Sequence, residues 1–221
     1  MRSLGQPKVL KQATAAALVT FVACFPRLWL APQLKYPLWY LGSLLFLASI
    51  VLWAFVLAWH SEYTGRPVFT FKVPLAPFIA ATSSGLAAII VLQLWVDPQL
   101  RARSPSEYPV NLEQWLVTTL FSLAFTQLFL VFAPFAWLMR LFQKQGPAIL
   151  LTVVFGVFVL IVRNRSSETS MPLLLLVDLL IVRVAVGFLS VYFFLRGGVL
   201  LVWWWALLLQ SRHLIYLRVQ L

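Results

Sequence analysis

The chain has few of the residues on which most soluble enzymes and metal proteins depend. Its 221 residues include one cysteine, two histidines and six acidic residues, and 10% of the residues are charged, against roughly 25% in an ordinary soluble domain. Because Cys24 is alone, an internal disulfide and a cysteine-based metal site are both excluded. With 62% hydrophobic residues and a mean hydropathy of +0.92, the composition predicts an all-α, polytopic transmembrane helix bundle.

Basic residues outnumber acidic ones by 17 to 6, which gives a formal charge of +11. They lie mostly between the apolar runs and do not gather in one patch. This distribution suits anionic lipid headgroups, and we expect anionic lipids as partners. A nucleic-acid partner is not expected, because it would need a clustered basic face on a folded surface.

Six apolar runs are long enough to be spans, since about 20 residues cross a bilayer core. They are residues 37–59, 76–96, 115–139, 147–162, 172–195 and 198–215. A seventh run, residues 13–31, contains Pro26 and Arg27, and we expect these two to break it into an interfacial or re-entrant segment. Residues 97–114 are expected to form a surface connector, because they are rich in Pro and Ser and carry mixed charge.

Basic residues between the runs favour six spans. If residues 1–36 only lie on or dip into the membrane, eleven basic residues share one side and five the other, as the positive-inside rule expects. We therefore predict residues 37–221 as the bundle, with both termini cytoplasmic, in a bacterial-type inner membrane. Seven spans remain the alternative, and they would divide the basic residues evenly.

Four polar residues lie inside apolar runs and are candidate intramembrane contacts: Thr126, Gln127, Asp178 and Arg183. An ionisable residue within a span is a functional suspect by default. However, Asp178 and Arg183 are five residues apart and do not share a helix face, so Asp178 can lie at headgroup depth while Arg183 snorkels. Two other interpretations of Asp178 and Arg183 are a buried contact with another helix and a role in substrate or proton handling.

His60 follows an apolar run, and His213 follows the unbroken apolar part of the last run, which ends at Leu209. Five predicted spans separate them, so they end on opposite membrane faces and cannot share a metal ion. We expect solvated or headgroup-facing histidines and no cofactor, with an axial ligand for haem or a chlorophyll-type pigment as the alternative. The ten tryptophans fit an interfacial belt.

Small and hydroxyl side chains mark two predicted packing faces. Such residues let membrane helices approach closely. In one run Ala80, Ser84 and Ala88 share a face and Ala81 and Gly85 lie on its neighbour, and in the next run the face consists of Thr119, Ser122 and Thr126. Gln127 lies off the second face, and it is expected to need an interhelical partner or a backbone carbonyl.

Residues 124–211 resemble the CAAX-protease and bacteriocin-processing family of intramembrane proteases, also called the CPBP or Abi family. The segment AFTQLFLVFAPFAWLMRLFQKQGPAILLTVVFGVFVLIV has the family's first helix, its basic turn, a Gly-Pro entry and Phe155 in place. GFLSVYFFLRGGVLLVWWWALLLQS supplies the Gly-bearing helix, the Gly-Gly turn and the closing helix.

Every catalytic position of the family departs in this chain. Thr126 and Gln127 replace its two glutamates, and Val131, Val159, Leu207 and Ser211 replace its arginine, its two histidines and its final Asn or Asp. The resemblance therefore implies a catalytically inactive relative, because no carboxylate base or histidine remains to activate water. No catalytic and no metal-ligating residue is predicted.

We expect a non-enzymatic membrane subunit or scaffold that binds partner membrane proteins and lipid within a larger complex. One alternative is an active intramembrane protease or hydrolase with unmatched residues, such as Asp178 with His213. The other is a pigment- or haem-binding subunit, which an absorption spectrum above roughly 350 nm would reveal.

Overall fold

The computed structural model describes residues 4–30, 36–105, 108–165 and 172–219. Regular structure in these ranges is helical, apart from an isolated bridge between Phe69 and Gly198. Six helices are long and apolar enough to cross a membrane, which confirms the predicted all-α bundle and fits an integral membrane protein. They are Pro7–Trp29, Leu38–Thr64, Leu75–Arg103, Leu112–Phe142, Gln145–Arg165 and Leu173–Leu217.

Three of the long helices contain wider π-helical turns. The elements in order are α1 (Pro7–Trp29), α2 (Leu38–Phe55), η1 (Val56–His60), α3 (Ser61–Thr64), α4 (Leu75–Val91), η2 (Leu92–Val96), α5 (Asp97–Arg103), α6 (Leu112–Phe121), η4 (Ser122–Thr126), η5 (Leu128–Phe132), α7 (Ala133–Phe142), α8 (Gln145–Arg165) and α9 (Leu173–Val219). The turns leave each helix continuous, so α2 to α3, α4 to α5 and α6 to α7 are three single rods.

Two of the π-helical turns have a proline as their cause. Pro98 follows η2, and Pro134 follows η5, in each case two residues after the turn ends. A proline inside a helix cannot donate to the carbonyl four residues earlier, and its ring crowds that carbonyl. A local widening before the proline relieves the crowding and keeps the helix intact.

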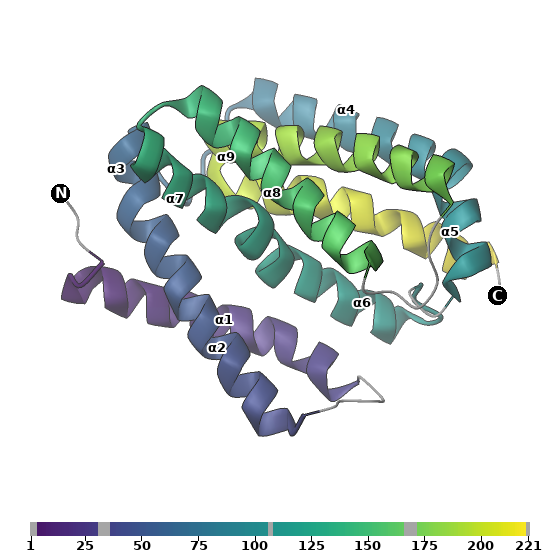
Figure 1. Ribbon diagram of the computed structural model, residues 1–221, viewed down its shortest axis with the longest axis horizontal. Helices are drawn as coiled ribbons and strands as arrows, with labels where there is room; N and C mark the ends of the chain where they lie inside the picture. Colours follow the sequence, from purple (N-terminus) through teal and green to yellow (C-terminus); the bar gives the residue numbers. More distant parts are fainter. Residues whose placement is uncertain (1–3, 31–35, 106–107, 166–171, 220–221) are drawn as a thin grey trace.

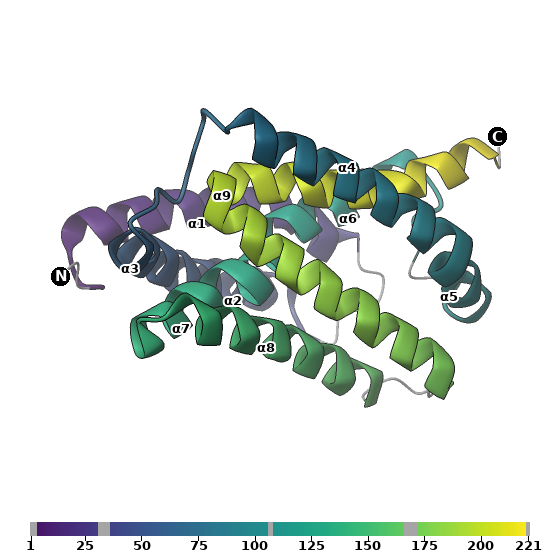
Figure 2. The same cartoon turned by 90° about the horizontal axis from the view of Figure 1, so that it is seen from above.

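The last helix reverses direction at Gly198. Its backbone there has φ 66° and ψ −162°, which lies outside helical geometry. This conformation is essentially restricted to glycine. The first arm of α9 (residues 173–197) and the second arm (residues 199–219) therefore form a hairpin (Figure 2). They correspond to the fifth and sixth predicted runs.

Successive helical segments run in alternate directions between the two ends of the molecule, and α2 crosses α1 steeply (Figures 1 and 2). The α1 helix lies close to the long axis and packs against α2 and α6. The α4 helix packs against α9, and α8 lies between α7 and α9. The two ends of the chain consequently lie at opposite ends of the bundle (Figure 1).

The expectation that Pro26 and Arg27 break the first apolar run is wrong. The α1 helix continues through both residues to Trp29. Proline costs one backbone hydrogen bond near the helix end, and packing on α2 compensates, because Gly42 gives Phe21 and Phe25 room to approach. The α1 helix also contributes buried side chains to the main core.

Large aromatic side chains fill the centre of the bundle. Phe132 on η5 and Phe194 on the first arm of α9 are fully buried, with ring centroids 4.6 Å apart. Trp53 on α2 is 1% exposed, and its indole N–H donates to the Thr20 hydroxyl of α1 at 2.9 Å. The packing of these rings in the core sets where the helices end, and the polar networks described below lie at those ends.

Candidate functional site

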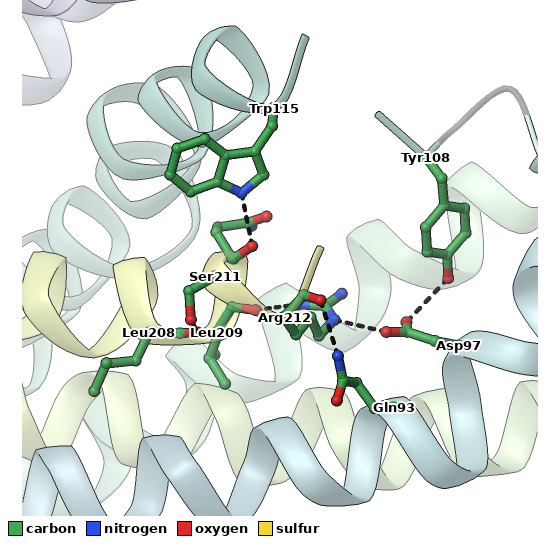
Figure 3. A network of polar contacts seen from close by, with 9 residues as sticks. Gln93, Asp97, Tyr108, Trp115, Leu208, Leu209, Ser211 and Arg212 are labelled. Carbon is green, nitrogen blue, oxygen red and sulfur yellow. Dashed lines mark hydrogen bonds and ion pairs between the residues drawn. The ribbon is translucent and has the colours of Figure 1, made fainter. Parts of the chain in front are cut away.

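A buried ion pair closes one end of the bundle. The Nε of Arg212, on the second arm of α9, lies 3.0 Å from an oxygen of Asp97, the first residue of α5. Tyr108 donates its hydroxyl to the other carboxylate oxygen, also at 3.0 Å (Figure 3). The side chain of Asp97 is only 3% exposed. A buried carboxylate needs partners of this kind, because the loss of its hydration is costly.

Backbone carbonyls of the second arm of α9 extend this network to two other helices. Gln93 on η2 donates to the carbonyl of Arg212 at 2.9 Å, and the indole of Trp115 on α6 donates to that of Gln210 at 2.9 Å (Figure 3). The Gln210 amide in turn donates to the Ser122 hydroxyl at 3.1 Å. Polar bonds thus tie α9 to both neighbouring rods.

Rings and a second arginine surround the ion pair. The Arg101 guanidinium lies 3.4 Å from the ring centroid of Tyr216 and 4.8 Å from that of Tyr108. The His213 ring contacts the Tyr108 ring edge to face, with centroids 5.3 Å apart. Burial, and then the Asp97 carboxylate, raise the pKa of Tyr108. Tyr108 therefore remains a hydrogen-bond donor across the ordinary pH range.

Sequence reasoning missed this network. Residues 97–114 were expected to form a surface connector, but Asp97 is buried and opens α5. The sequence positions of Asp97 and Arg212 did not predict their contact, because 115 residues separate them. A usable signal was an acid directly after one apolar run and an arginine near the end of another, both at the same end of the predicted bundle.

The other histidine, His60, lies at the opposite end of the bundle, at the end of η1. It is fully buried, and neither ring nitrogen has a hydrogen-bond partner among the described residues. Its ring packs on Phe194 with centroids 4.1 Å apart, and Phe135 lies at 6.1 Å. Within the described ranges, no group of three histidine, cysteine or acidic residues is placed to hold a metal ion.

Thr126 and Gln127 lie where two π-helical turns meet. Thr126 ends η4, Gln127 follows it, and η5 begins at Leu128. Gln127 is buried, and its side-chain oxygen has no hydrogen-bond partner in the part of the chain that the structure describes. The described residues therefore make no interhelical hydrogen bond through this oxygen.

Asp178 and Arg183 project from the first arm of α9 toward different helices. The indole of Trp95 donates to Asp178 at 2.9 Å, close to the start of the arm. The Nε of Arg183 donates to the carbonyl of Gly156 on α8 at 3.2 Å. Gly156 makes room for the guanidinium, since a Cβ there would lie 2.8 Å from it.

The predicted small-residue face of α4 meets the second arm of α9. A Cβ on Gly85 would lie 2.9 Å from Leu208, so the two helices are in close contact. Ala80, Ser84 and Ala88 flank this contact and are partly buried. On α6, Thr119 is 2% exposed.

The helices that carry the positions matched to the protease family contact one another. The α9 helix touches η4 and η5, and α8 touches η5 and α9. Phe129 on η5 meets Phe155 on α8 with ring centroids 5.6 Å apart. Ser211, at a matched position, donates its hydroxyl to the carbonyl of Leu208 in its own helix at 2.7 Å.

Comparison of the chain with protein-family models, with curated proteins and with solved structures finds no match in any of the three.

Proposed function

We propose that this chain is a non-enzymatic membrane subunit that binds partner membrane proteins and lipid. The observation that carries the proposal is Arg183, a cationic side chain halfway along an apolar arm. It lies ten residues after Leu173, the start of α9, or about 15 Å into a bilayer core about 30 Å thick.

Arg183 forms one hydrogen bond among the described residues, which leaves much of its guanidinium available. Its Nε donates to Gly156, whereas a guanidinium carries five N–H donors. The side chain is only partly buried, and no carboxylate of a described residue forms an ion pair with it. A charge at this depth is costly unless it is paired. A carboxylate or polar group on a partner helix would supply the missing acceptors.

An apolar groove on the other side of α8 supports lipid or helix binding. Its volume is about 480 Å³, and its walls come from α2, η5, α7 and α8. Aromatic rings line much of it, among them Phe55, Phe129, Trp137 and Phe158. Such a groove is suited to an acyl chain or to the side chains of a membrane helix.

The proposed lack of enzymatic activity rests on Gln127 and on the resemblance to the protease family. A neutral amide donates and accepts hydrogen bonds, but it cannot take a proton from water. We therefore propose that the chain is a pseudoprotease in ancestry. We further propose a bacterial-type cytoplasmic membrane as its location, since basic residues at both ends of the bundle suit anionic headgroups.

Removal of the mid-helix charge tests the proposal. The tagged protein is solubilised gently from native membranes, and the proteins that co-purify are identified. We expect a defined membrane protein to co-purify with the wild type and with Arg183→Lys, and to be lost with Arg183→Leu. Ile181→Ala, at a neighbouring position that is 63% exposed, is the matched control and should retain it.

Folding of the variants separates a partner contact from a structural one. Arg183→Leu removes one hydrogen bond to Gly156. We therefore expect the free energy of unfolding of the isolated variant to lie within about 1 kcal/mol of the wild-type value. A wild type that purifies as a lone chain would contradict the proposal. Equal co-purification with Arg183→Leu would contradict the role of the arginine.

A further inference from the structure

A cationic pocket lies at the opposite end of the bundle from the Asp97 ion pair, beside the turn between the two arms of α9. Its volume is about 390 Å³. Three basic residues, Arg66, Lys72 and Arg196, line it together with Thr70, and none of its lining residues is acidic. Glu62, on α3, precedes this segment but does not line the pocket.

The pocket is held in shape by backbone contacts. Residues 66–74 join α3 to α4 and cross the turn of α9, where the Val199 N–H donates to the Val68 carbonyl at 2.9 Å. Gly198 allows this approach, because a Cβ there would lie 2.4 Å from the same carbonyl oxygen. Arg66 also donates to the carbonyl of Leu195 at the end of the first arm. Arg66 and Lys72 therefore lie on a strap, residues 66–74, that is held in place by these contacts, and Arg196 lies on the turn that the strap crosses.

Backbone groups add to the positive potential of the pocket. Gly197 and Gly198 form part of its wall, and the second arm of α9 begins directly after them. The amino end of a helix carries a partial positive charge and has N–H groups without intrahelical partners. Side chains and helix end thus favour the same ligand, an anion with several acceptor oxygens.

The surroundings of the pocket indicate a lipid as the source of that anion. The pocket lies where helices that are long and apolar enough to cross a membrane end, and the ends of spanning helices are where headgroups contact a chain. Phe71, between Thr70 and Lys72, is 86% exposed, and Leu75, at the start of α4, is 72% exposed. An exposed ring beside a cation is typical of a segment that sits in the membrane interface. A free anion would need no apolar rim.

We propose that Arg66, Lys72 and Arg196 bind the phosphate of an anionic phospholipid headgroup, while Phe71 and Leu75 contact its acyl region. This inference deepens the lipid-binding part of the proposed function. It does not depend on a protein partner or on Arg183, so either proposal can fail without the other.

Native mass spectrometry of the purified chain tests the pocket. The protein is equilibrated with vesicles of phosphatidylcholine and phosphatidylglycerol, and the lipid that stays bound is identified. We expect phosphatidylglycerol to be retained in preference to phosphatidylcholine. The double variant Lys72→Gln with Arg196→Gln should weaken retention about thirtyfold, from the contribution of two cations near an anionic headgroup. It leaves Arg66 and the backbone bridge intact, so the strap should stay folded.

Charge-matched controls exclude general electrostatic attraction. Lys8→Gln with Lys144→Gln removes two exposed cations at the same end of the bundle, outside the pocket, and should leave retention unchanged. Equal loss in this control would overturn the proposal. Displacement of the lipid by millimolar inorganic phosphate would also overturn it, because the site would then recognise a free anion. Equal retention of phosphatidylcholine would overturn it as well.

Discussion

Two substitutions of the buried amide Gln127 test a structural role and a catalytic role of this residue separately. Its sequence position predicted that the amide needs an interhelical partner or a backbone carbonyl, so that its loss would perturb stability or assembly. In the structure its oxygen has no hydrogen-bond partner among the described residues, and replacement of an unsatisfied polar group by an apolar one is nearly neutral or stabilising. We therefore expect Gln127→Leu to leave the thermal stability of the isolated protein unchanged or raised, and to reduce co-purification if a partner supplies the donor. A marked loss of stability in the isolated chain would contradict this.

The same residue allows a direct test of lost catalysis. Gln127→Glu restores a carboxylate at a position where the resembling proteases have one, but the matched histidines are Val159 and Leu207 in this chain. We expect no cleavage by this variant in a proteolysis assay with membrane substrates, because a base alone does not assemble the site. Detectable cleavage would show that other catalytic groups are present.

Asp97 should be the most sensitive charged residue in the bundle. Asp97→Ala leaves Arg212, whose side chain is 17% exposed, without its counter-ion. Removal of one partner of a buried pair typically costs about 3 to 5 kcal/mol. We expect a large drop in the thermal unfolding temperature in detergent, and a smaller one for Tyr108→Phe, which removes one hydrogen bond. Glu113→Ala, at an exposed position on α6, is the control and should change little.

At the scale of the element, the turn within α9 depends on one glycine. Gly198→Ala meets a backbone conformation that side chains rarely adopt and a contact of 2.4 Å with the Val68 carbonyl. Gly65→Ala meets only the positive φ of 68°, with open space around it, and Gly5→Ala meets neither. We expect stability losses in the order Gly198, Gly65, Gly5, with about 1 to 2 kcal/mol for Gly65 and more for Gly198. Thermal unfolding of the three variants measures this order, and an equal response at Gly65 and Gly198 would contradict it.

Apolar periodicity and run length predicted the helices well, but they predicted the breaks and turns between helices less well. Pro26, Pro98 and Pro134 all lie inside continuous helices, because packing and local π-helical turns offset the missing hydrogen bonds. The hairpin at Gly198 matched the boundary between two predicted runs. The Asp97 to Arg212 pair could not be predicted from local patterns, since it depends on which helix ends meet in space. The functional importance of Gln127, Asp178 and Arg183 remains a prediction.

At the scale of the whole molecule, charge and packing favour different topologies. Counting of basic residues favoured six spans with α1 at the interface, which places both termini on one side. In the structure α1 is a helix of 23 residues that is apolar enough to cross the membrane, and it runs close to the long axis of the molecule (Figures 1 and 2). Because α9 folds back at Gly198, seven segments then alternate in direction. We infer that this packing reflects seven crossings, with the termini on opposite sides.

Labelling of single cysteines distinguishes the two topologies. In a Cys24→Ala background, cysteines are placed at Lys8, Lys144 and Glu113, all of them exposed positions near helix ends. Seven crossings put Lys8 on the same side as Lys144, because α1, α2, the α4 to α5 rod and the α6 to α7 rod each cross between them. An interfacial α1 would instead put Lys8 on the same side as Glu113. We expect a membrane-impermeant maleimide, applied to oriented vesicles, to label Lys8→Cys and Lys144→Cys together and Glu113→Cys only from the other side. Joint labelling of Lys8→Cys and Glu113→Cys would show that α1 lies on the membrane although it packs along the bundle axis.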